Sequence, residues 1–243
     1  MQAILPSTSV GQIVAERPQL ARIFEELQID YCCGGKRPLA DVCRELGLDA
    51  ADLARRLANE EAAATSSVDW NSARLTSLCD HIQQTHHDYL RRELPRLSAL
   101  LDKVVSAHGA RHAELVGIRS TFGELRAELE PHMMKEERIL FPAIRFLEAN
   151  RQAQFPFGPL ANPIRVMVDE HDHAGDALAR LRKLTHDYSP PADACNTYRA
   201  MLEGLATLER DMHEHVHKEN NILFPRAASL ESSLRESTEE AHD

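Results

Sequence analysis

The sequence predicts an all-α protein, a four-helix bundle with a small N-terminal helical domain. The first observation is a motif that occurs twice, His-x-x-x-Glu-x-x-Ile-Leu-Phe-Pro, beginning at His132 and again at His215. The second is a pair of His-Asp dipeptides, at His87 and His171, whose separation along the chain is almost the same. The third is the composition, with 43% hydrophobic but only 5% aromatic residues, which suits helices packed through aliphatic side chains. A His-Asp helix followed by a His-x-x-x-Glu helix, twice over, makes four helices.

The chain divides into four segments in this interpretation. Residues 1–60 form the small helical domain, residues 61–69 a linker, residues 70–230 the bundle, and residues 231–243 a tail that we expect to fray. In the small domain, apolar residues at helical spacing are interrupted by Pro18 and by Gly34-Gly35, which predicts short helices joined by tight turns. In the bundle, Pro95 is expected to kink the first helix or end it early, and Pro131 to kink the second.

The bulk composition excludes several classes of function. A net charge of −10 argues against a nucleic-acid partner, because phosphate binding needs clustered Lys and Arg. No apolar run reaches the roughly 20 residues of a membrane span, and the first residues lack the pattern of a secretion signal. We therefore expect a cytoplasmic protein without a membrane partner. Five scattered cysteines are too few for a disulfide framework.

The repeated motif indicates a metal centre in the core of the bundle. Residues four apart lie on one face of a helix, so each copy can aim an imidazole and a carboxylate at the same point. A carboxylate that faces a core is costly unless it is paired or binds a metal, and two matched copies make a buried salt bridge the weaker interpretation. One predicted stripe on the second helix contains Phe122, Leu125, Leu129, His132, Glu136, Ile139 and Leu140.

Two further histidines complete the predicted site. His171 lies on the apolar face of the third helix, and His87 is preferred over His86 because its separation from His171 matches that of the motifs. The predicted metal ligands are His87, His132, Glu136, His171, His215 and Glu219. Four imidazoles and two carboxylates suit two borderline divalent ions, whereas calcium and magnesium prefer all-oxygen sites. The spacing alone leaves di-iron, di-zinc and di-manganese centres open.

Several other residues have more than one interpretation. His213 and His217 lie away from the ligand stripe, so we expect them to face solvent. Glu170, next to His171, either supports the metal site, gates access to the metal, or is an ordinary surface acid. The pair Cys32-Cys33 is too tight for a zinc site. It is either a redox thiol pair, a transient grip on iron or on a damaged cluster, or two ordinary turn residues.

These motifs resemble those of the repair-of-iron-centres (RIC) family, hemerythrin-like di-iron proteins of bacteria that help restore iron–sulfur clusters after nitrosative and oxidative damage. The segments that carry the resemblance are Asp30-Tyr31-Cys32-Cys33-Gly34-Gly35-Lys36, His132-Met133-Met134-Lys135-Glu136-Glu137 and Glu219-Asn220-Asn221-Ile222-Leu223-Phe224-Pro225. Pro131 departs from the small polar residue expected before His132, which bears on local helix geometry and not on ligand identity.

The resemblance implies the identity and the roles of the metal ligands. It implies two non-haem iron ions, with His87, His132, His171 and His215 as terminal ligands and Glu136 and Glu219 as bridges. It also implies that Glu170 matters near the metal, that the protein is cytoplasmic, and that it tends to form homodimers.

We therefore expect a di-iron protein that repairs damaged iron–sulfur clusters, by supplying iron or by removing nitric oxide. Its partners would be damaged iron–sulfur proteins, with nitric oxide or oxygen as the small ligand, and Cys32-Cys33 would contact the client or an electron donor. Three alternatives stay open: an enzyme that reduces nitric oxide at the same centre, a sensor or carrier of oxygen or nitric oxide, and a structural zinc bundle. The added N-terminal domain counts against a simple carrier, because such carriers need only the bundle.

Overall fold

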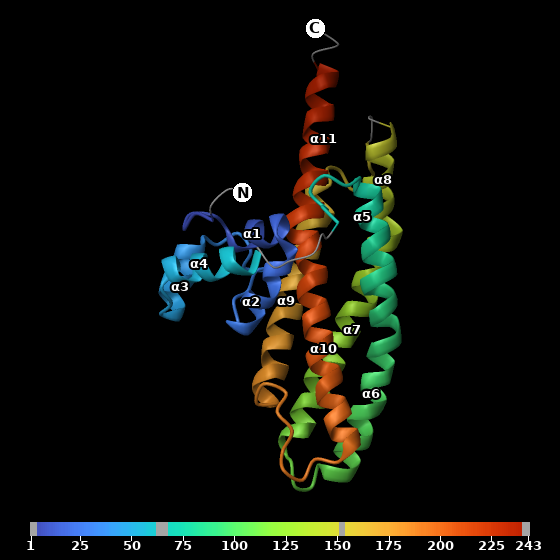
Figure 1. Cartoon of the computed structure of the whole chain (residues 1–243). Helices are drawn as coiled ribbons and strands as arrows, with labels where there is room; N and C mark the ends of the chain where they lie inside the picture. Colours follow the sequence, from blue (N-terminus) through green and yellow to red (C-terminus); the bar gives the residue numbers. More distant parts are fainter. Residues whose placement is uncertain (1–3, 62–67, 151–153, 240–243) are drawn as a thin grey trace. The chain divides into compact units, whose positions relative to one another are not determined.

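The computed structural model describes residues 4–61, 68–150 and 154–239. All regular structure in these ranges is helical, apart from one isolated β-bridge between Ser9 and Pro38, which confirms the predicted all-α class (Figure 1). Each described helix is too short or too polar to cross a membrane. The protein divides into two compact units. Met1–Cys79, Leu147–Ala153 and His213–Asp243 form the first unit, and Asp80–Phe146 and Gln154–Met212 form the second.

Short helices make up the N-terminal part of the first unit. They are α1 (Val10–Glu16), the 3₁₀ turn η1 (Pro18–Leu20), α2 (Ala21–Glu26), α3 (Leu39–Leu46) and α4 (Ala50–Glu61). Ser9 Oγ accepts the N–H of Gln12 and so caps α1. Gly47 ends α3 with a φ of +67°, a left-handed conformation that glycine adopts without strain. Their apolar faces share a core of Val10, Ile13, Val14, Leu20, Ile23, Phe24, Ile29, Tyr31, Leu39, Val42, Cys43, Leu53 and Leu57.

The first unit also contains the end of α10 (Asn196–Lys218), the π turn η4 (Glu219–Leu223) and α11 (Phe224–Glu239). The side-chain amide of Asn221 in η4 donates to the carbonyl oxygens of Tyr31 (3.3 Å) and Cys32 (3.0 Å). A Cβ added to Gly11 or Gly35 would lie 2.3 or 2.4 Å from Asn221 Oδ1, so only glycine allows this close approach. The loop that carries Cys32-Cys33 is therefore docked on η4.

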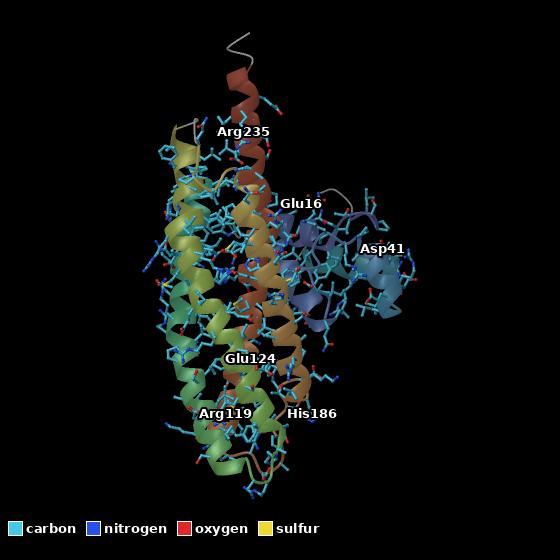
Figure 2. All side chains as sticks on the ribbon, turned by 180° about the vertical axis from the view of Figure 1, so that it is seen from behind. Glu16, Asp41, Arg119, Glu124, His186 and Arg235 are labelled. Atoms are coloured by element: carbon cyan, nitrogen blue, oxygen red, sulfur yellow. The ribbon has the colours of Figure 1, made fainter. Side chains whose placement is uncertain are left out.

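Long helices build the second unit. It contains the end of α5 (Leu75–Ile82), the π turn η2 (Gln83–His87), α6 (Asp88–His108), α7 (Glu114–Lys135), the π turn η3 (Glu136–Leu140), the start of α8 (Phe141–Asn150), α9 (Ala161–Leu184) and most of α10. α7 packs against both α6 and α9. On α7, Arg119 and Glu124 are exposed (Figure 2), while Phe122 between them is buried, as expected for a helix with one apolar face.

Pro95 and Pro131, the prolines expected to disturb the first two bundle helices, are accommodated inside long helices. Pro95 lies within α6, which continues to His108, and Pro131 lies within α7, which continues to Lys135. The alternative that Pro95 ends its helix early is wrong, because buried side chains on both sides of it hold α6 in place despite the missing hydrogen bond. The predicted tail is helical as far as Glu239. Residues 240–243 of the tail and 62–67 of the linker lie outside the described residues.

Three π turns interrupt the long helices, and periodicity did not predict them. In η3 the N–H of Phe141 donates to the carbonyl of Glu136, and in η4 that of Phe224 donates to Glu219, five residues back instead of four. A proline follows each Phe, and its ring would clash with the carbonyl four residues earlier in a regular α-helix. The wider turn relieves this clash. The repeated Phe-Pro thus accounts for η3 and η4, while η2 has no such proline.

The π turn η3 also changes which residues face the core. Leu140 is buried, but Ile139 is 47% exposed, so the predicted stripe is wrong at Ile139. That prediction assumed a rotation of about 100° per residue throughout the helix, and a π turn rotates less.

Candidate metal centre

Three of the six candidate ligands lie on π turns, an element that is frequent at functional sites. His87 ends η2, Glu136 begins η3 and Glu219 begins η4. The other three, His132, His171 and His215, lie on α7, α9 and α10. None of the six side chains is more than 3% exposed. The local backbone therefore points all six away from solvent.

Within each unit, imidazole Nε2 atoms approach a carboxylate. In the second unit, Nε2 of His87 and Nε2 of His132 lie 3.3 and 3.4 Å from the same oxygen, Oε2 of Glu136. His132 Nε2 also lies 3.2 Å from His171 Nε2. In the first unit, His215 Nε2 lies 3.1 Å from Oε1 of Glu219. The predicted pairing of residues four apart is present in both copies of the motif.

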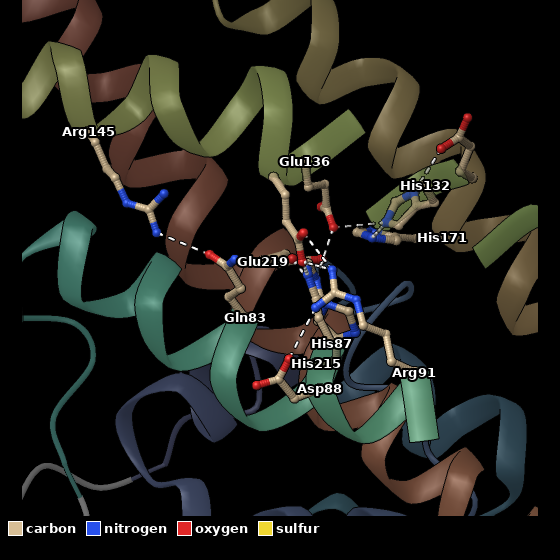
Figure 3. Close-up of polar contacts among 12 residues, drawn as sticks. Gln83, His87, Asp88, Arg91, His132, Glu136, Arg145, His171, His215 and Glu219 are labelled. Carbon is tan, nitrogen blue, oxygen red and sulfur yellow. Dashed lines mark hydrogen bonds and ion pairs between the residues drawn. The ribbon is translucent and has the colours of Figure 1, made fainter. Parts of the chain in front are cut away.

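The six side chains form two groups that could each hold a metal ion, with ligand atoms within 4.8 Å of one another. One group is His87, Glu136, His215 and Glu219, and the other is His132, Glu136, His171 and Glu219 (Figure 3). Both glutamates belong to both groups. A carboxylate has two oxygens and can contact two ions, so this arrangement suits two neighbouring cations. The structure thus brings together all six residues that the sequence singled out.

The chemistry of Glu136 fits a bound cation. Its side chain is fully buried, and neither of its oxygens accepts a hydrogen bond from any residue in the described ranges. A buried carboxylate without hydrogen bonds is unfavourable, whereas a metal ion offsets its charge. The close approach of His132 Nε2 to His171 Nε2 fits the same interpretation, because two lone pairs aimed at one point attract a cation.

Two carboxylates outside the six hold the histidines in place. His87 Nδ1 donates to Oε1 of Glu137 (2.7 Å), and His132 Nδ1 donates to Oε2 of Glu170 (2.7 Å). A proton held on Nδ1 leaves the lone pair on Nε2, the atom that faces Glu136. This pattern is common around metal-bound histidines. The sequence analysis named Glu170 but missed Glu137, which carries no spacing signal beyond its place after Glu136.

Arg91 and Lys135 keep the two outer carboxylates, Glu137 and Glu170, negatively charged. Burial alone would raise the pKa of Glu137, but hydrogen bonds from Arg91 and His87 outweigh it and lower the pKa. Arg91 Nη2 lies 2.5 Å from each oxygen of Glu137. Burial likewise opposes the lowering of the Glu170 pKa, which results from hydrogen bonds with Lys135 and His132. Both groups therefore act as acceptors for the imidazoles.

Comparison with known proteins decides the family. Residues 78–227 match the hemerythrin HHE cation binding domain, and residues 6–61 match a domain of unknown function, DUF542. The chain is 41% identical over 219 residues to the iron-sulfur cluster repair protein YtfE of Musicola paradisiaca, an alignment that covers 90% of this chain and 95% of that protein. The chain belongs to the YtfE-type family of iron–sulfur cluster repair proteins. This confirms the resemblance found in the motifs.

Two more relatives of the family show the same extent of similarity. YtfE of Yersinia pseudotuberculosis serotype IB is 38% identical over 220 residues, which is 90% of this chain and 96% of that protein. A probable iron-sulfur cluster repair protein of Haemophilus influenzae is 36% identical over 219 residues, 89% of this chain and 95% of that protein. The similarity therefore includes the N-terminal helices as well as the bundle.

The neighbouring histidines have structural partners. His86 is buried and its Nδ1 lies 2.9 Å from Oδ1 of Asp211, so it belongs to neither metal group. The expectation that His217 faces solvent is wrong, since it is 5% exposed and donates from Nδ1 to the carbonyl of Tyr31 (3.3 Å). Burial lowers the pKa of His217 to about 4, which keeps it neutral. His213 is half-buried and bonds to Glu25 Oε1 at 2.8 Å. The bundle pattern could not show that the N-terminal loop covers this face.

The cysteine pair forms a compact turn around Asp30. Asp30 Oδ1 accepts the N–H of Cys32 (2.9 Å) and lies 3.2 Å from its Sγ, and Oδ2 accepts the N–H of Gly34 (2.8 Å). Cys32 is buried and Cys33 half-buried, and both are free thiols. A hydrogen bond with Cys33 and burial raise the pKa of Cys32 well above its ordinary value. Cys32 is therefore a protonated thiol, and Cys33 is the more accessible of the two.

Proposed function

We propose that this protein repairs damaged iron–sulfur clusters by means of a di-iron centre. The observation that carries the proposal is the pair of buried four-residue groups with Glu136 and Glu219 in common. Relatives that are 36–41% identical are iron-sulfur cluster repair proteins by name, which supports the activity. A donor set of imidazoles and carboxylates is well suited to non-haem iron.

In this proposal each ion has two imidazoles of its own. His87 and His215 would hold one ion, His132 and His171 would hold the other, and the two shared glutamates would serve both. Iron bound there would supply redox chemistry and coordination positions for a small diatomic ligand. The negative charges of the glutamates offset part of the charge of the ions.

The protein itself orients the ligands and excludes water. Glu137 and Glu170 keep the Nδ1 protons of His87 and His132, so that both Nε2 atoms face inward. A client cluster could not reach the six buried side chains without an opening. The side chain of Glu170 is 29% exposed, against 16% for that of Glu137. We propose that displacement of Glu170 from His132 would open the centre to small ligands or release iron.

The docked N-terminal loop would present Cys33 to a client or to an electron donor. Cys33 is half-buried, and its loop is held by Asn221, two residues after Glu219. This position supports a role for the cysteine pair in repair.

The test is repair of a purified iron–sulfur enzyme inactivated by nitric oxide. Protein loaded with isotope-labelled iron should restore its activity, and Glu136→Ala should not, while Glu124→Ala, at an exposed position of the preceding helix α7, should behave as wild type. Transfer of the label into the client would identify iron supply, and release of nitrous oxide without transfer would identify nitric oxide removal. Equal recovery with and without the protein would contradict the proposal.

A further inference from the structure

A second cluster of metal-binding side chains lies at the far end of α6. His108 ends this 21-residue helix, which places it about 30 Å along the axis from Asp88. His112 lies in the turn that leads to α7, and Asp193 lies in the loop before α10. These three side chains offer ligand atoms within 4.8 Å of one another. Figure 1 shows the turn, in green, and the loop, in orange, at the same end of the bundle.

The backbone brings these residues together in two steps. The N–H of His112 donates to the carbonyl of His108 (3.0 Å), so the turn continues the helical spacing and puts both imidazoles on one side. His112 Nε2 then lies 3.0 Å from Oδ1 of Asp193. His108 Nε2 lies 3.2 Å from Sγ of Cys195, the residue before α10. Each imidazole thus faces one potential ligand from the opposite loop.

Neighbouring groups orient the two rings. His112 Nδ1 lies 3.0 Å from Oε1 of Glu114, an arrangement that leaves Nε2 for a metal. The buried ring of Tyr198 makes edge contacts with both imidazoles, with centroid distances of 5.4 Å to His108 and 5.7 Å to His112. Such packing restricts ring rotation before any ligand binds.

The thiol and the buried imidazole are also suited to a cation. Cys195 Sγ lies beside the buried imidazole of His108, and cysteine sulfur is a common zinc ligand. His108 is 6% exposed, and its Nδ1 makes no hydrogen bond with any residue in the described ranges. A buried imidazole that is only half satisfied is unfavourable, and a bond to a cation offsets that cost.

We propose that His108, His112, Asp193 and Cys195 form a zinc-type site that ties the α6–α7 turn to the loop before α10. Two imidazoles, a carboxylate and a thiolate form a borderline donor set that suits Zn²⁺. Tetrahedral bonds of about 2.1 Å to nitrogen and oxygen and about 2.3 Å to sulfur separate ligand atoms by about 3.4–3.5 Å. The two pairs, now 3.0 and 3.2 Å apart, would therefore have to open by only a few tenths of an ångström. Asp193 and Cys195 are exposed, so the site exchanges ions with solvent directly.

The competing interpretation is an ion pair without a metal. A protonated His112 could bridge Glu114 and Asp193, whose hydrogen bonds raise its pKa in that order. Arg111 Nη1 also lies 3.6 Å from Oδ2 of Asp193 and would partly neutralise the carboxylate. That interpretation gives no role to the contact between His108 and Cys195, whereas a metal site uses all four residues.

Cobalt titration of the full-length protein, with iron already filling the candidate di-iron centre, tests the proposal. Co²⁺ bound to a thiolate has an intense near-ultraviolet charge-transfer band, and the six residues of the buried centre include no cysteine. We expect this band with one Co²⁺ bound, its displacement by Zn²⁺, and its loss in Cys195→Ser. It should persist in Cys32→Ser/Cys33→Ser, the matched control for the other cysteine cluster.

Two exposed or half-buried ligands provide variants that are expected to fold. His112→Gln and Asp193→Asn should each weaken Zn²⁺ binding at least about tenfold in competition with a chromophoric chelator. The exposed His186, in the same unit, supplies the control His186→Gln, which should bind as wild type. A band that survives in Cys195→Ser, or Zn²⁺ affinity that is unchanged in both ligand variants, would overturn the proposal.

Discussion

The two copies of the repeated motif, His132–Pro142 and His215–Pro225, have the same backbone conformation but differ in the residues that their side chains contact. Both place a π turn at the glutamate and end it before Phe-Pro. In the first copy the next residue, Glu137, accepts from His87 and from Arg91. In the second copy Asn221 instead donates to the loop of Cys32. In the first copy a charged carboxylate therefore holds a candidate ligand, His87, whereas the second copy binds the loop of the N-terminal helices.

The helices that follow the two motifs, α8 and α11, also make different contacts. α8, which follows the first copy, offers the carboxylate of Glu148 to the N–H groups of Leu75 (2.8 Å) and Thr76 (3.0 Å). α11, which follows the second, offers Arg226 to the carbonyls of Trp70 (2.6 Å) and Ala73 (2.5 Å). An acid caps the start of α5, and a base binds the carbonyls just before it. The segments after the two motifs therefore bind the same end of α5 through opposite charges, at positions that are not equivalent in the repeat.

The largest effect should come from the glutamates that both metal groups share. Glu136→Ala and Glu219→Ala should each abolish stoichiometric iron binding, because each removes a ligand from both groups. Metal analysis of the purified variants measures this, with Glu124→Ala as the control. Full iron content in either variant would mean that the copies act independently, which the shared-ligand account forbids.

The outer carboxylates should matter less than the shared glutamates. Glu137→Gln and Glu170→Gln should each reduce iron affinity about 10- to 100-fold, because the hydrogen bond to Nδ1 loses its charge. Equilibrium competition with a chelator gives the affinity. Glu130→Gln, which removes an exposed acid paired only with Arg126 on the same helix, is the matched control and should change nothing.

Asn221 tests the docking function of the second copy. Asn221→Ala should destabilise the first unit by about 1–3 kcal/mol, because the carbonyl of Cys32 loses the amide donor and that of Tyr31 keeps only His217. The equivalent position in the first copy is the exposed Arg138, and Arg138→Ala should stay within about 0.5 kcal/mol of wild type. Urea unfolding of both variants, followed by limited proteolysis near Cys32, measures the contrast. Equal effects at the two positions would mean that the copies do not differ in this way.

Glu148 should give the smallest effect, and one that depends on pH. Hydrogen bonds from Thr76 and Leu75 outweigh burial and lower its pKa below the ordinary 4.5. The unfolded chain therefore takes up the proton first as the pH falls, so the stabilisation is complete above pH 4.5 and is lost below it. Glu148→Gln should cost about 1 kcal/mol at neutral pH and progressively less below pH 4.5. The matched Arg226→Met should show no such dependence in the same acid range.

Local spacing was enough to predict much of this site, because helical geometry relates sequence distance to direction. The pairs four residues apart and the match between His87 and His171 identified all six clustered side chains. The π turns were not predicted, since η3 and η4 depend on how a proline ring meets one carbonyl, and η2 has no proline to signal it. For the same reason Ile139 was placed in the core and is exposed.

Helical periodicity could not predict contacts between segments that are far apart in the sequence. His217 lies off the bundle stripe, and only the docked loop of Tyr31 buries it. Glu137 supports His87 across 50 positions of sequence, with no motif to connect them. His108, His112 and Asp193 showed no usable pattern, because their cluster depends on a turn and a loop that meet at the end of the bundle.

The most direct test of the shared-ligand centre is anomalous X-ray diffraction from crystals of the iron-loaded protein at the iron absorption edge. The account predicts two peaks, one in each of the two groups, with Glu136 and Glu219 in contact with both. A single peak, or peaks that lie away from these glutamates, would contradict it.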